Sequence, residues 1–391
     1  TGNSQVTANF GQDSSFAGNK TAQGKQDGND IGDFYYTPPT GYLALCTKNL
    51  PDVAVTPSEH FNTLLWSGNG STNAITGAGF EPSLIWSKDR NGTENHIWLD
   101  QVRGNTHRLS SNDTSAETSD SNAALSSFDS DGFTLTQYHD SNQNSSTNVG
   151  WVWKANGSGS SNTNGSINST VSANVDAGFS IVSYTGTGSN ATVGHGLSLA
   201  PELIITKNRI DAVNWVVGTN SIAWTKYLFL DTTGAQGTSA NPWNNTTPTS
   251  SVFTVGSAPD TNGSSDAMIA YCFHSVDGYS KVGSYIANGE QDDGTFIYTG
   301  FRPAFVMIKK TSASASWYMT DSERYDTNRP YGSAAYLFAE SSAAESTTEN
   351  IDMLSNGFKA RRDSGYFNYP SGATYIYIAF AETPFKYSNA R

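Results

Sequence analysis

The sequence predicts an all-β protein with three tandem repeated units, each a β-sandwich or jelly-roll-like fold, behind an extended N-terminal arm. Three observations predict it: a motif that occurs three times, short apolar runs separated by turn residues, and the lack of any long helical period. The 391 residues include 37 glycines, and 12% are aromatic although only 36% are hydrophobic. This composition is typical of short strands joined by many turns, and it is too rich in aromatic residues for a disordered chain.

The repeated motif is an apolar run that follows a proline and ends on a lysine six residues after it. It occurs at Pro82–Lys88, Pro201–Lys207 and Pro303–Lys309. Each copy lies between an upstream aromatic residue with a Gly-rich turn and a downstream tryptophan, phenylalanine and closing aromatic strand. The repeat is about 100–120 residues long, whereas solenoid repeats usually have about 20–45. A unit of this size can have its own core.

Strands are predicted by the pattern of apolar residues. The runs 84–87, 203–205, 305–308 and 375–380 are apolar on both faces of the pleat, which is typical of central strands. Residues 179–184 alternate between apolar and polar, which predicts a half-exposed strand.

Turns separate these strands. Clusters of Asp, Ser and Gly at 129–132 and 292–294 are typical turn sequences. Residues 342–345 are sufficient for one helical turn at most.

The domain limits that we expect are an arm, or the tail of an upstream domain, at 1–60, and β-sandwich units at 61–157, 158–282 and 283–391. The Ser/Asn/Gly-rich segment 155–178 is expected to join the first two units.

Charge and composition exclude several classes of protein. The net charge of −13 argues against sequence-independent binding of nucleic acid and against docking on anionic membranes. No apolar run reaches the roughly 18 residues that a membrane-spanning helix needs. Cys46 and Cys272 lie outside any CxxC pair, so we expect two free buried thiols, with a single bridge as the alternative.

No catalytic motif is present, since nucleophile elbows, Walker loops and dinucleotide fingerprints are absent. The carboxylates that could serve a glycosidase are Asp100 and Asp321, which occupy similar repeat positions. Each is followed by an arginine three residues later, so a local ion pair is the favoured interpretation. We therefore predict no catalytic, cofactor or metal-binding residues and a protein that is not an enzyme. The histidines lack metal-ligand spacing and are interpreted as surface or packing residues: His60, His96, His107, His139, His195 and His274.

Two acidic clusters are weak candidates for calcium, and solvated turns are the favoured interpretation of both. One is Asp129 with Asp131, and the other consists of Asp27, Asp30 and Asp33.

Aromatic residues in polar surroundings are candidates for binding a sugar, namely Trp224, Trp243 and Tyr366. Tryptophans that recur across the copies are assigned to the core instead, namely Trp98, Trp215 and Trp317.

The repeated stretches 79–90, 179–186, 271–273 with 278–281, and 300–309 resemble a family of virion proteins of marine tailed bacteriophages, of cyanophage and pelagiphage type. Segments 10–50 and 378–386 are similar to that family as well. The resemblance implies a virion structural part, such as a fibre or appendage, and it transfers no active residue. Such proteins often carry a lectin-like or laminin-G-like sandwich upstream. Because the sequence starts at Thr1 without an initiator Met, we expect that an upstream part was removed or that the chain is a piece of a longer product.

We therefore expect a non-enzymatic virion protein outside the cell, in a fibre-like appendage that attaches to the host surface. Its expected partners are further copies of itself in a homotrimer, other virion proteins and a host-surface glycan, with no cofactor. The alternatives are a capsid decoration or head-fibre protein, a carbohydrate-binding module of an extracellular assembly, a polysaccharide depolymerase, and a cellular surface-layer or filament protein. The sequence leaves open whether the three units form a row or surround a pseudo-threefold axis.

Overall fold

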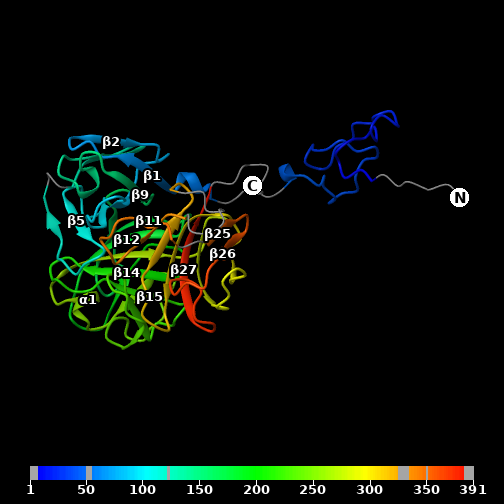
Figure 1. The fold of residues 1–391 in the computed structure, drawn as a ribbon. Helices are drawn as coiled ribbons and strands as arrows, with labels where there is room; N and C mark the ends of the chain where they lie inside the picture. The colour runs from blue at the N-terminus through cyan, green and yellow to red at the C-terminus, as the bar shows by residue number, and fades with distance from the viewer. Residues whose placement is uncertain (1–7, 50–54, 121–123, 325–333, 349–350, 383–391) are drawn as a thin grey trace. The chain divides into compact units, whose positions relative to one another are not determined.

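The computed structural model describes residues 8–49, 55–120, 124–324, 334–348 and 351–382 (Figure 1). The chain divides into two compact units, one with residues 1–53 and 384–391 and the other with residues 54–383. We call the described part of the first unit, residues 8–49, the arm, and that of the second, residues 55–382, the β body. Each is described by itself.

The arm has little regular structure and is built from turns. Its regular elements are the 3-10 helix η1 (Thr47–Asn49) and an isolated antiparallel bridge between Lys25 and Phe34. A chain of this length buries little apolar surface, and its buried residues are Ser14, Asp27 and Ala44.

Asp27 holds the turns of the arm together. Its carboxylate accepts hydrogen bonds from the amides of Asn29, Ile31 and Ala44 and from Asn49 Nδ2. Burial alone would raise the pKa of Asp27, but these hydrogen bonds outweigh it and lower the pKa to about 2. Asp27 therefore organises a turn, which agrees with the turn interpretation of the acidic cluster that contains it.

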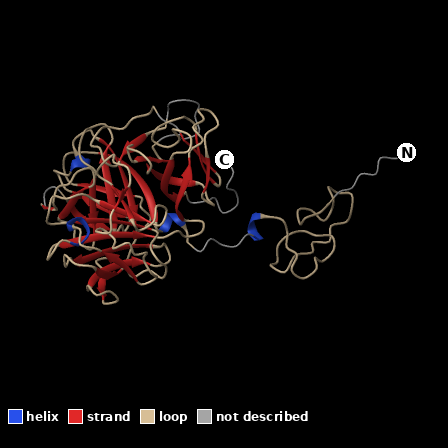
Figure 2. Cartoon of the chain, turned by 90° about the horizontal axis from the view of Figure 1, so that it is seen from below, coloured by secondary structure: helices blue, strands red, loops and turns tan. Residues whose placement is uncertain are grey.

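The β body confirms the predicted all-β class, since strands make up 38% of the residues and helices 3% (Figure 2). Its helices are η2 (Pro57–Glu59), η3 (Asp140–Asn142) and α1 (Pro259–Asn262). Among the described residues, no helix has the length and apolar character needed to cross a bilayer.

Three large antiparallel sheets form the body, and five strands follow one another in the same order in each. The first sheet has the order β1 (Phe61–Ser67), β9 (Thr147–Trp153), β3 (Leu84–Asp89), β4 (Ile97–Asp100), β5 (His107–Ser110), β6 (Thr118–Ser119). The second has the order β10 (Ser160–Asn162), β11 (Ser169–Asn174), β12 (Phe179–Thr185), β19 (Ala267–Phe273), β14 (Leu203–Asn208), β15 (Val216–Thr219), β16 (Lys226–Phe229), β17 (Gly237–Thr238). The third has the order β20 (Ser280–Ile286), β27 (Thr374–Ala381), β22 (Pro303–Lys310), β23 (Tyr318–Asp321), β24 (Tyr336–Phe338).

Three smaller sheets complete the body. They contain β2 (Asn73–Thr76), β8 (Gly132–Leu135) and β7 (Leu125–Asp129); β13 (Ala191–Gly194) and β18 (Val252–Val255); and β21 (Phe296–Tyr298), β26 (Gly357–Ala360) and β25 (Ile351–Leu354). Each small sheet shares a hydrophobic cluster with one large sheet. We call each such pair of sheets a unit: the first contains β1–β9, the second β10–β19 and the third β20–β27.

The four apolar runs form the strands β3, β14, β22 and β27, and each of these strands is central in its sheet, as predicted. The half-exposed strand predicted at 179–184 is wrong, because β12 lies between β11 and β19 and is mostly buried. The reason is that both faces of β12 are covered, since Phe179 and Ile181 belong to one hydrophobic cluster and Val182 and Tyr184 to another. Segment 155–178 is also more than a connection, since it contributes β10 and β11 to the edge of the second sheet. The domain limits stay a prediction, and β20 spans the limit expected between residues 282 and 283.

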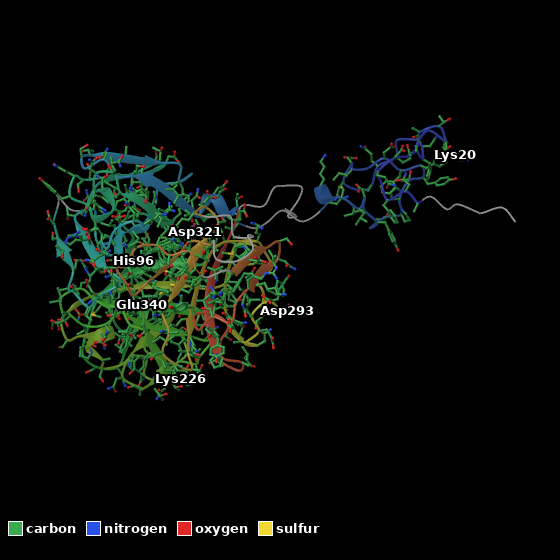
Figure 3. All side chains as sticks on the ribbon, in the orientation of Figure 1. Lys20, His96, Lys226, Asp293, Asp321 and Glu340 are labelled. Carbon is green, nitrogen blue, oxygen red and sulfur yellow. The ribbon has the colours of Figure 1, made fainter. Side chains whose placement is uncertain are left out.

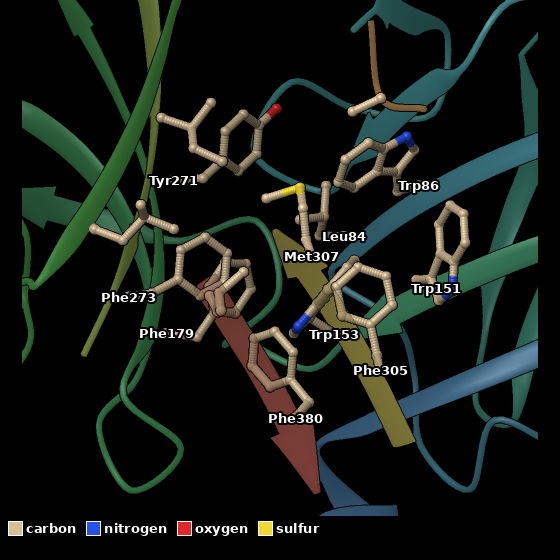
Figure 4. Packing of buried hydrophobic residues seen from close by; sticks show 14 of the residues in the cluster. Leu84, Trp86, Trp151, Trp153, Phe179, Tyr271, Phe273, Phe305, Met307 and Phe380 are labelled. Atoms are coloured by element: carbon tan, nitrogen blue, oxygen red, sulfur yellow. The ribbon is translucent and has the colours of Figure 1, made fainter. Parts of the chain in front are cut away.

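One aromatic cluster joins the three units (Figure 4). Phe380 of the third unit stacks on Phe61 of the first at 4.9 Å between ring centroids. It also contacts Trp153 of the first unit, Phe273 of the second and Phe305 of its own unit. The units therefore surround a shared core, with their large sheets facing inward, in addition to the smaller cluster that each unit forms between its own two sheets.

We predict that Phe380→Ala lowers the free energy of unfolding by about 3–5 kcal/mol, because it opens a cavity where all three units meet. The matched control is Leu199→Ala, at a side chain that is 57% exposed, and its effect is expected to stay within about 0.5 kcal/mol. Chemical denaturation of both variants measures the difference. Equal losses would contradict a shared core.

Candidate functional site

The carboxylates considered for hydrolysis lie buried where one unit meets the next. Asp100 Oδ2 accepts from Arg103 Nε at 2.5 Å, and both side chains are fully buried. The same oxygen accepts the Tyr271 hydroxyl of the second unit at 2.8 Å. A carboxylate without access to solvent cannot reach a glycosidic oxygen, so Asp100 has a structural role.

Asp321 repeats this arrangement between the third unit and the first. Its Oδ2 accepts from Arg324 Nε at 2.6 Å and from Trp151 Nε1 at 3.0 Å. The local ion pairs favoured by the three-residue spacing are thus present at both positions (Figure 3 labels Asp321).

Each buried pair continues into a second ion pair across the same contact. Arg103 Nη1 lies 3.1 Å from Glu117 Oε2, and Glu117 Oε1 lies 2.6 Å from Arg209 of the second unit. The amide of Glu117 also donates to the Arg209 carbonyl at 2.9 Å.

The contact between the third unit and the first has the equivalent pairs. Arg324 Nη1 lies 3.0 Å from Glu345 Oε2, which also bonds Arg90 of the first unit at 2.9 Å. The amide of Glu345 donates to the Arg90 carbonyl at 2.8 Å. Glu345 lies in the segment where at most one helical turn was expected, and the structure has no helix there.

The contact between the second unit and the third keeps the backbone bond but has none of these charges. Gln236 N donates to the Thr311 carbonyl at 3.1 Å, as Glu117 and Glu345 do to their partners. The strand register aligns Thr219 with Asp100 and Asp321, and it aligns Ile378 with Tyr271 and Trp151. The remaining equivalent positions, which hold arginines and an acid in the other contacts, are neutral as well. These neutral residues are Thr219, Ile222, Gln236, Thr311 and Ile378.

The lysines of the repeated motif are also buried. Burial lowers the pKa of Lys88, Lys207 and Lys309 to about 8. Their ammonium groups donate to main-chain carbonyls: Asp89 and Gly92 for Lys88; Thr114, Asp211 and Val213 for Lys207; Thr233 and Ala315 for Lys309. The motif therefore specifies a structural contact, which in the second and third units reaches the preceding unit.

Another repeated position holds Asn112, Asp231 and Glu340, two residues beyond β5, β16 and β24. Each side chain accepts a hydrogen bond from the main-chain amide at the start of the neighbouring strand. Burial raises the pKa of Asp231 to about 6, against smaller opposing effects of Asn214, Trp215 and Lys207. Burial also raises the pKa of Glu340.

The recurrent tryptophans lie in the shared core, as predicted. They do not occupy equivalent positions in the three units, however, because the strand register aligns Trp98 with Val217 and Met319. The residue before the strand pair is His96 in the first unit and Trp215 and Trp317 in the others. Trp215 and Trp317 donate from Nε1 to main-chain carbonyls of the preceding unit at 2.9 and 2.8 Å.

Three histidines are packing residues, which is one of the two roles, surface or packing, expected from the sequence. Burial lowers the pKa of His96 well below its usual value, that of His139 to about 3, and that of His195. They are therefore neutral at physiological pH.

The tryptophans proposed as a sugar platform are buried, which is a correction to the prediction. Trp224 and Trp243 pack against each other at 5.4 Å and lie over Gly218. Tyr366 packs on Phe338 at 4.7 Å. Their polar sequence neighbours lie in loops, and loop composition does not show what tertiary packing covers.

Acidic residues of both clusters accept hydrogen bonds from neighbouring protein groups. Asp129 accepts from Ser127 and Thr134, and Asp131 accepts from the amides of Gly77 and Gly79. In the arm, Asp33 accepts from the Ser14 amide, whereas Asp30 has a left-handed turn conformation. No group of three or more His, Cys, Asp or Glu in the described part of the chain could hold a metal ion.

Both cysteines are free, so the single bridge is wrong. Cys272 is buried as expected, but Cys46 is exposed.

The arm contains a cavity of about 400 Å³ that the sequence reasoning missed. Phe16, Phe34, Tyr35 and the pair Pro38–Pro39 line it. Four further lining residues are each more than half exposed: Phe10, Tyr36, Tyr42 and Leu45. The density of aromatic residues and prolines at 34–45 is the sequence signal that could have shown it. We call this feature the arm groove.

Comparison with known proteins places the β body in a family. The family described as "Domain of unknown function (DUF7483)" matches residues 56–384. The chain belongs to this family. A search of curated proteins finds no match. The DUF7483 region thus covers the whole β body, including both ionic contacts, and leaves out the arm.

We predict that Asp100→Asn costs about 3–5 kcal/mol of stability, because it leaves the buried Arg103 guanidinium without its main counter-ion. The matched control is the triple variant Asp100→Thr, Arg103→Ile and Tyr271→Phe, which removes the buried acid, its arginine and the aromatic donor together, with the first two changed to the residues of the uncharged contact. It should lose less stability than the single variant in thermal or chemical denaturation. A larger loss in the triple variant would show that the charges themselves stabilise the contact.

We predict that Asp231→Asn stabilises the protein by about 1–2 kcal/mol at pH 7–8. Because the folded-state pKa of Asp231 is raised to about 6, the folded protein favours the protonated acid, and this contribution to stability is lost as pH rises from about 4 to 6. Asn112 already occupies the equivalent position in the first unit. Melting curves from pH 4 to 8 should show the difference from wild type growing with pH, and a constant difference would contradict the raised pKa.

Proposed function

We propose that this protein is a non-enzymatic structural component of a virion, a fibre or appendage protein that acts outside the cell at the host surface. The main support is where the buried charge lies. Asp100, Arg103, Asp321 and Arg324 are fully buried in contacts between units, where they join the second and third units to the first. A rigid β body with its ionic groups turned inward suits a mechanical part better than a catalyst.

Further support comes from the sequence. The repeated motifs resemble virion proteins of marine tailed bacteriophages, and the chain has a net charge of −13 with few charged residues. Membership of a family of unknown function adds no information on the role.

Labelling the parent particles tests the proposal. Antibody fragments against the β body should decorate an appendage in electron micrographs of the phage, and purified protein should bind host cells. Decoration of the capsid shell would favour the alternative of a capsid decoration or head-fibre protein. Absence of the protein from particles would overturn the virion role.

A second candidate function, binding of a carbohydrate, is favoured by the arm groove. Exposed tyrosines next to polar groups can stack on sugar rings, and Asn9 and Thr37 contribute polar groups to the lining.

We predict that Tyr36→Ala with Tyr42→Ala reduces binding to host cells or to a glycan array at least about tenfold, which corresponds to about 1.4 kcal/mol. The matched control is Tyr138→Ala, at a tyrosine of the β body that is 66% exposed. Equal binding by the tyrosine pair variant and the wild type would exclude the groove as the sugar site.

A further inference from the structure

The edge strand β21 of the third unit carries exposed apolar side chains. Phe296 and Tyr298 are 44% and 66% exposed, whereas Ile297 between them is buried. Ile286, at the end of β20, is 62% exposed. It lies beside the start of β21, because Thr295 Oγ1 donates to its carbonyl at 3.1 Å. The three side chains therefore belong to one edge of the body.

The equivalent positions of the other units are small or polar. The register aligns Ile297 with Ile75 and Val193, since all three lie opposite the phenylalanine of the neighbouring strand. The residues that correspond to Ile286, Phe296 and Tyr298 are Ser67, Ala74 and Thr76 in the first unit and Thr185, Thr192 and Gly194 in the second. The fold thus forms twice without large apolar residues there, so folding does not explain them in the third unit.

The outer side of the β21 backbone has no partner strand among the residues that the structure describes. Thr295 O accepts from Ala360 N at 3.1 Å, and Thr299 N donates to Asn356 O at 3.0 Å. In an antiparallel pair, alternate residues turn their amide and carbonyl groups to opposite sides. Those of Phe296 and Tyr298 therefore point away from β26, at the edge of the sheet.

The second unit covers the equivalent edge, whereas the described residues of the third unit leave it uncovered. Ile167 forms a parallel bridge with Val193 of β13, and its amide donates to Thr192 O at 3.0 Å. Among the described residues, no segment pairs with β21 in this way. An uncovered edge with apolar side chains is a template for another strand.

Ion pairs lie beside β21. Lys359, directly opposite Phe296, pairs with Asp293, and Arg361 pairs with Asp352. Glu290 and Asp292 are further acids before the strand. In a chain with a net charge of −13, the two cations lower the repulsion between two copies at this edge.

We propose that β21 pairs with the same strand of a second copy, antiparallel, about a two-fold axis at Ile297. Phe296 then lies opposite the partner subunit's Tyr298, and Tyr298 opposite the partner subunit's Phe296. Both residues have outward main-chain groups, so each opposed pair exchanges two hydrogen bonds, and the aromatic rings meet on one face. The strand is self-complementary because its two aromatic residues are placed symmetrically about Ile297.

This inference deepens the proposed role, on which it rests, by naming the surface through which copies assemble. A two-fold contact gives dimers or even-numbered assemblies, in place of the homotrimer expected from the sequence. The contact is small compared with the about 1,200–2,000 Å² of a standard interface, so we expect a Kd of about 1–100 µM.

Sedimentation equilibrium of the full chain between about 1 and 300 µM tests the proposal. The wild type should dimerise, and the double variant Phe296→Thr with Tyr298→Thr should weaken dimerisation at least tenfold without lowering the melting temperature. The matched control is Ala74→Lys with Thr76→Lys, on the equivalent edge of the first unit, which should dimerise normally. Hydrogen exchange should show the amides of residues 296 and 298 protected at high concentration in the wild type and in the control variant, and unprotected in the double variant.

A wild type that stays monomeric over this range would overturn the inference. Oligomers that persist in the double variant would overturn it as well, since another surface would then hold the copies together. In either case the virion role is judged separately, by the location of the protein on particles.

Discussion

A buried charge must have its full set of partners or be absent, and the contacts between the three units follow this constraint. Two contacts carry the complete set of acid, arginine, second acid, second arginine and aromatic donor around Asp100 and Asp321. The third replaces all of these residues with neutral ones and keeps the backbone hydrogen bond. A partial set would leave an ion in a medium that solvates it poorly, at a cost of several kcal/mol.

The shared aromatic core explains why the units act as one body. Each large sheet turns one face to its own small sheet and the other to the common cluster. A unit that loses its neighbours would expose phenylalanine and tryptophan residues at its centre. This arrangement also gives the buried lysines of the repeated motif a role, because Lys207 and Lys309 reach carbonyls of the preceding unit.

Departures from the repeat mark the parts of the molecule with separate roles. Positions in the buried contacts between units differ from the repeat as complete sets, as in the uncharged contact between the second and third units. Phe296 and Tyr298 of β21 change alone, on the outside, where packing imposes no constraint. The arm lies outside the matched family region and contains the apolar arm groove. These two surfaces, rather than the interior, are where the molecule can meet partners.

The sequence by itself determined the all-β class, the central strands and the pairing of Asp100 with Arg103 and Asp321 with Arg324, because continuous apolar runs and three-residue spacings are local properties. It could not determine that the units surround one core, that 155–178 adds strands to a sheet, or that Trp224 and Trp243 are buried, since loop composition carries no information on distant contacts. The alignment of His96 with Trp215 and Trp317 likewise depends on strand register. Only the tertiary structure decided which residues of different units meet, because a buried charge or an exposed edge is defined by neighbours far away in the sequence, from 76 residues for Lys309 and Thr233 to 255 for Arg90 and Glu345.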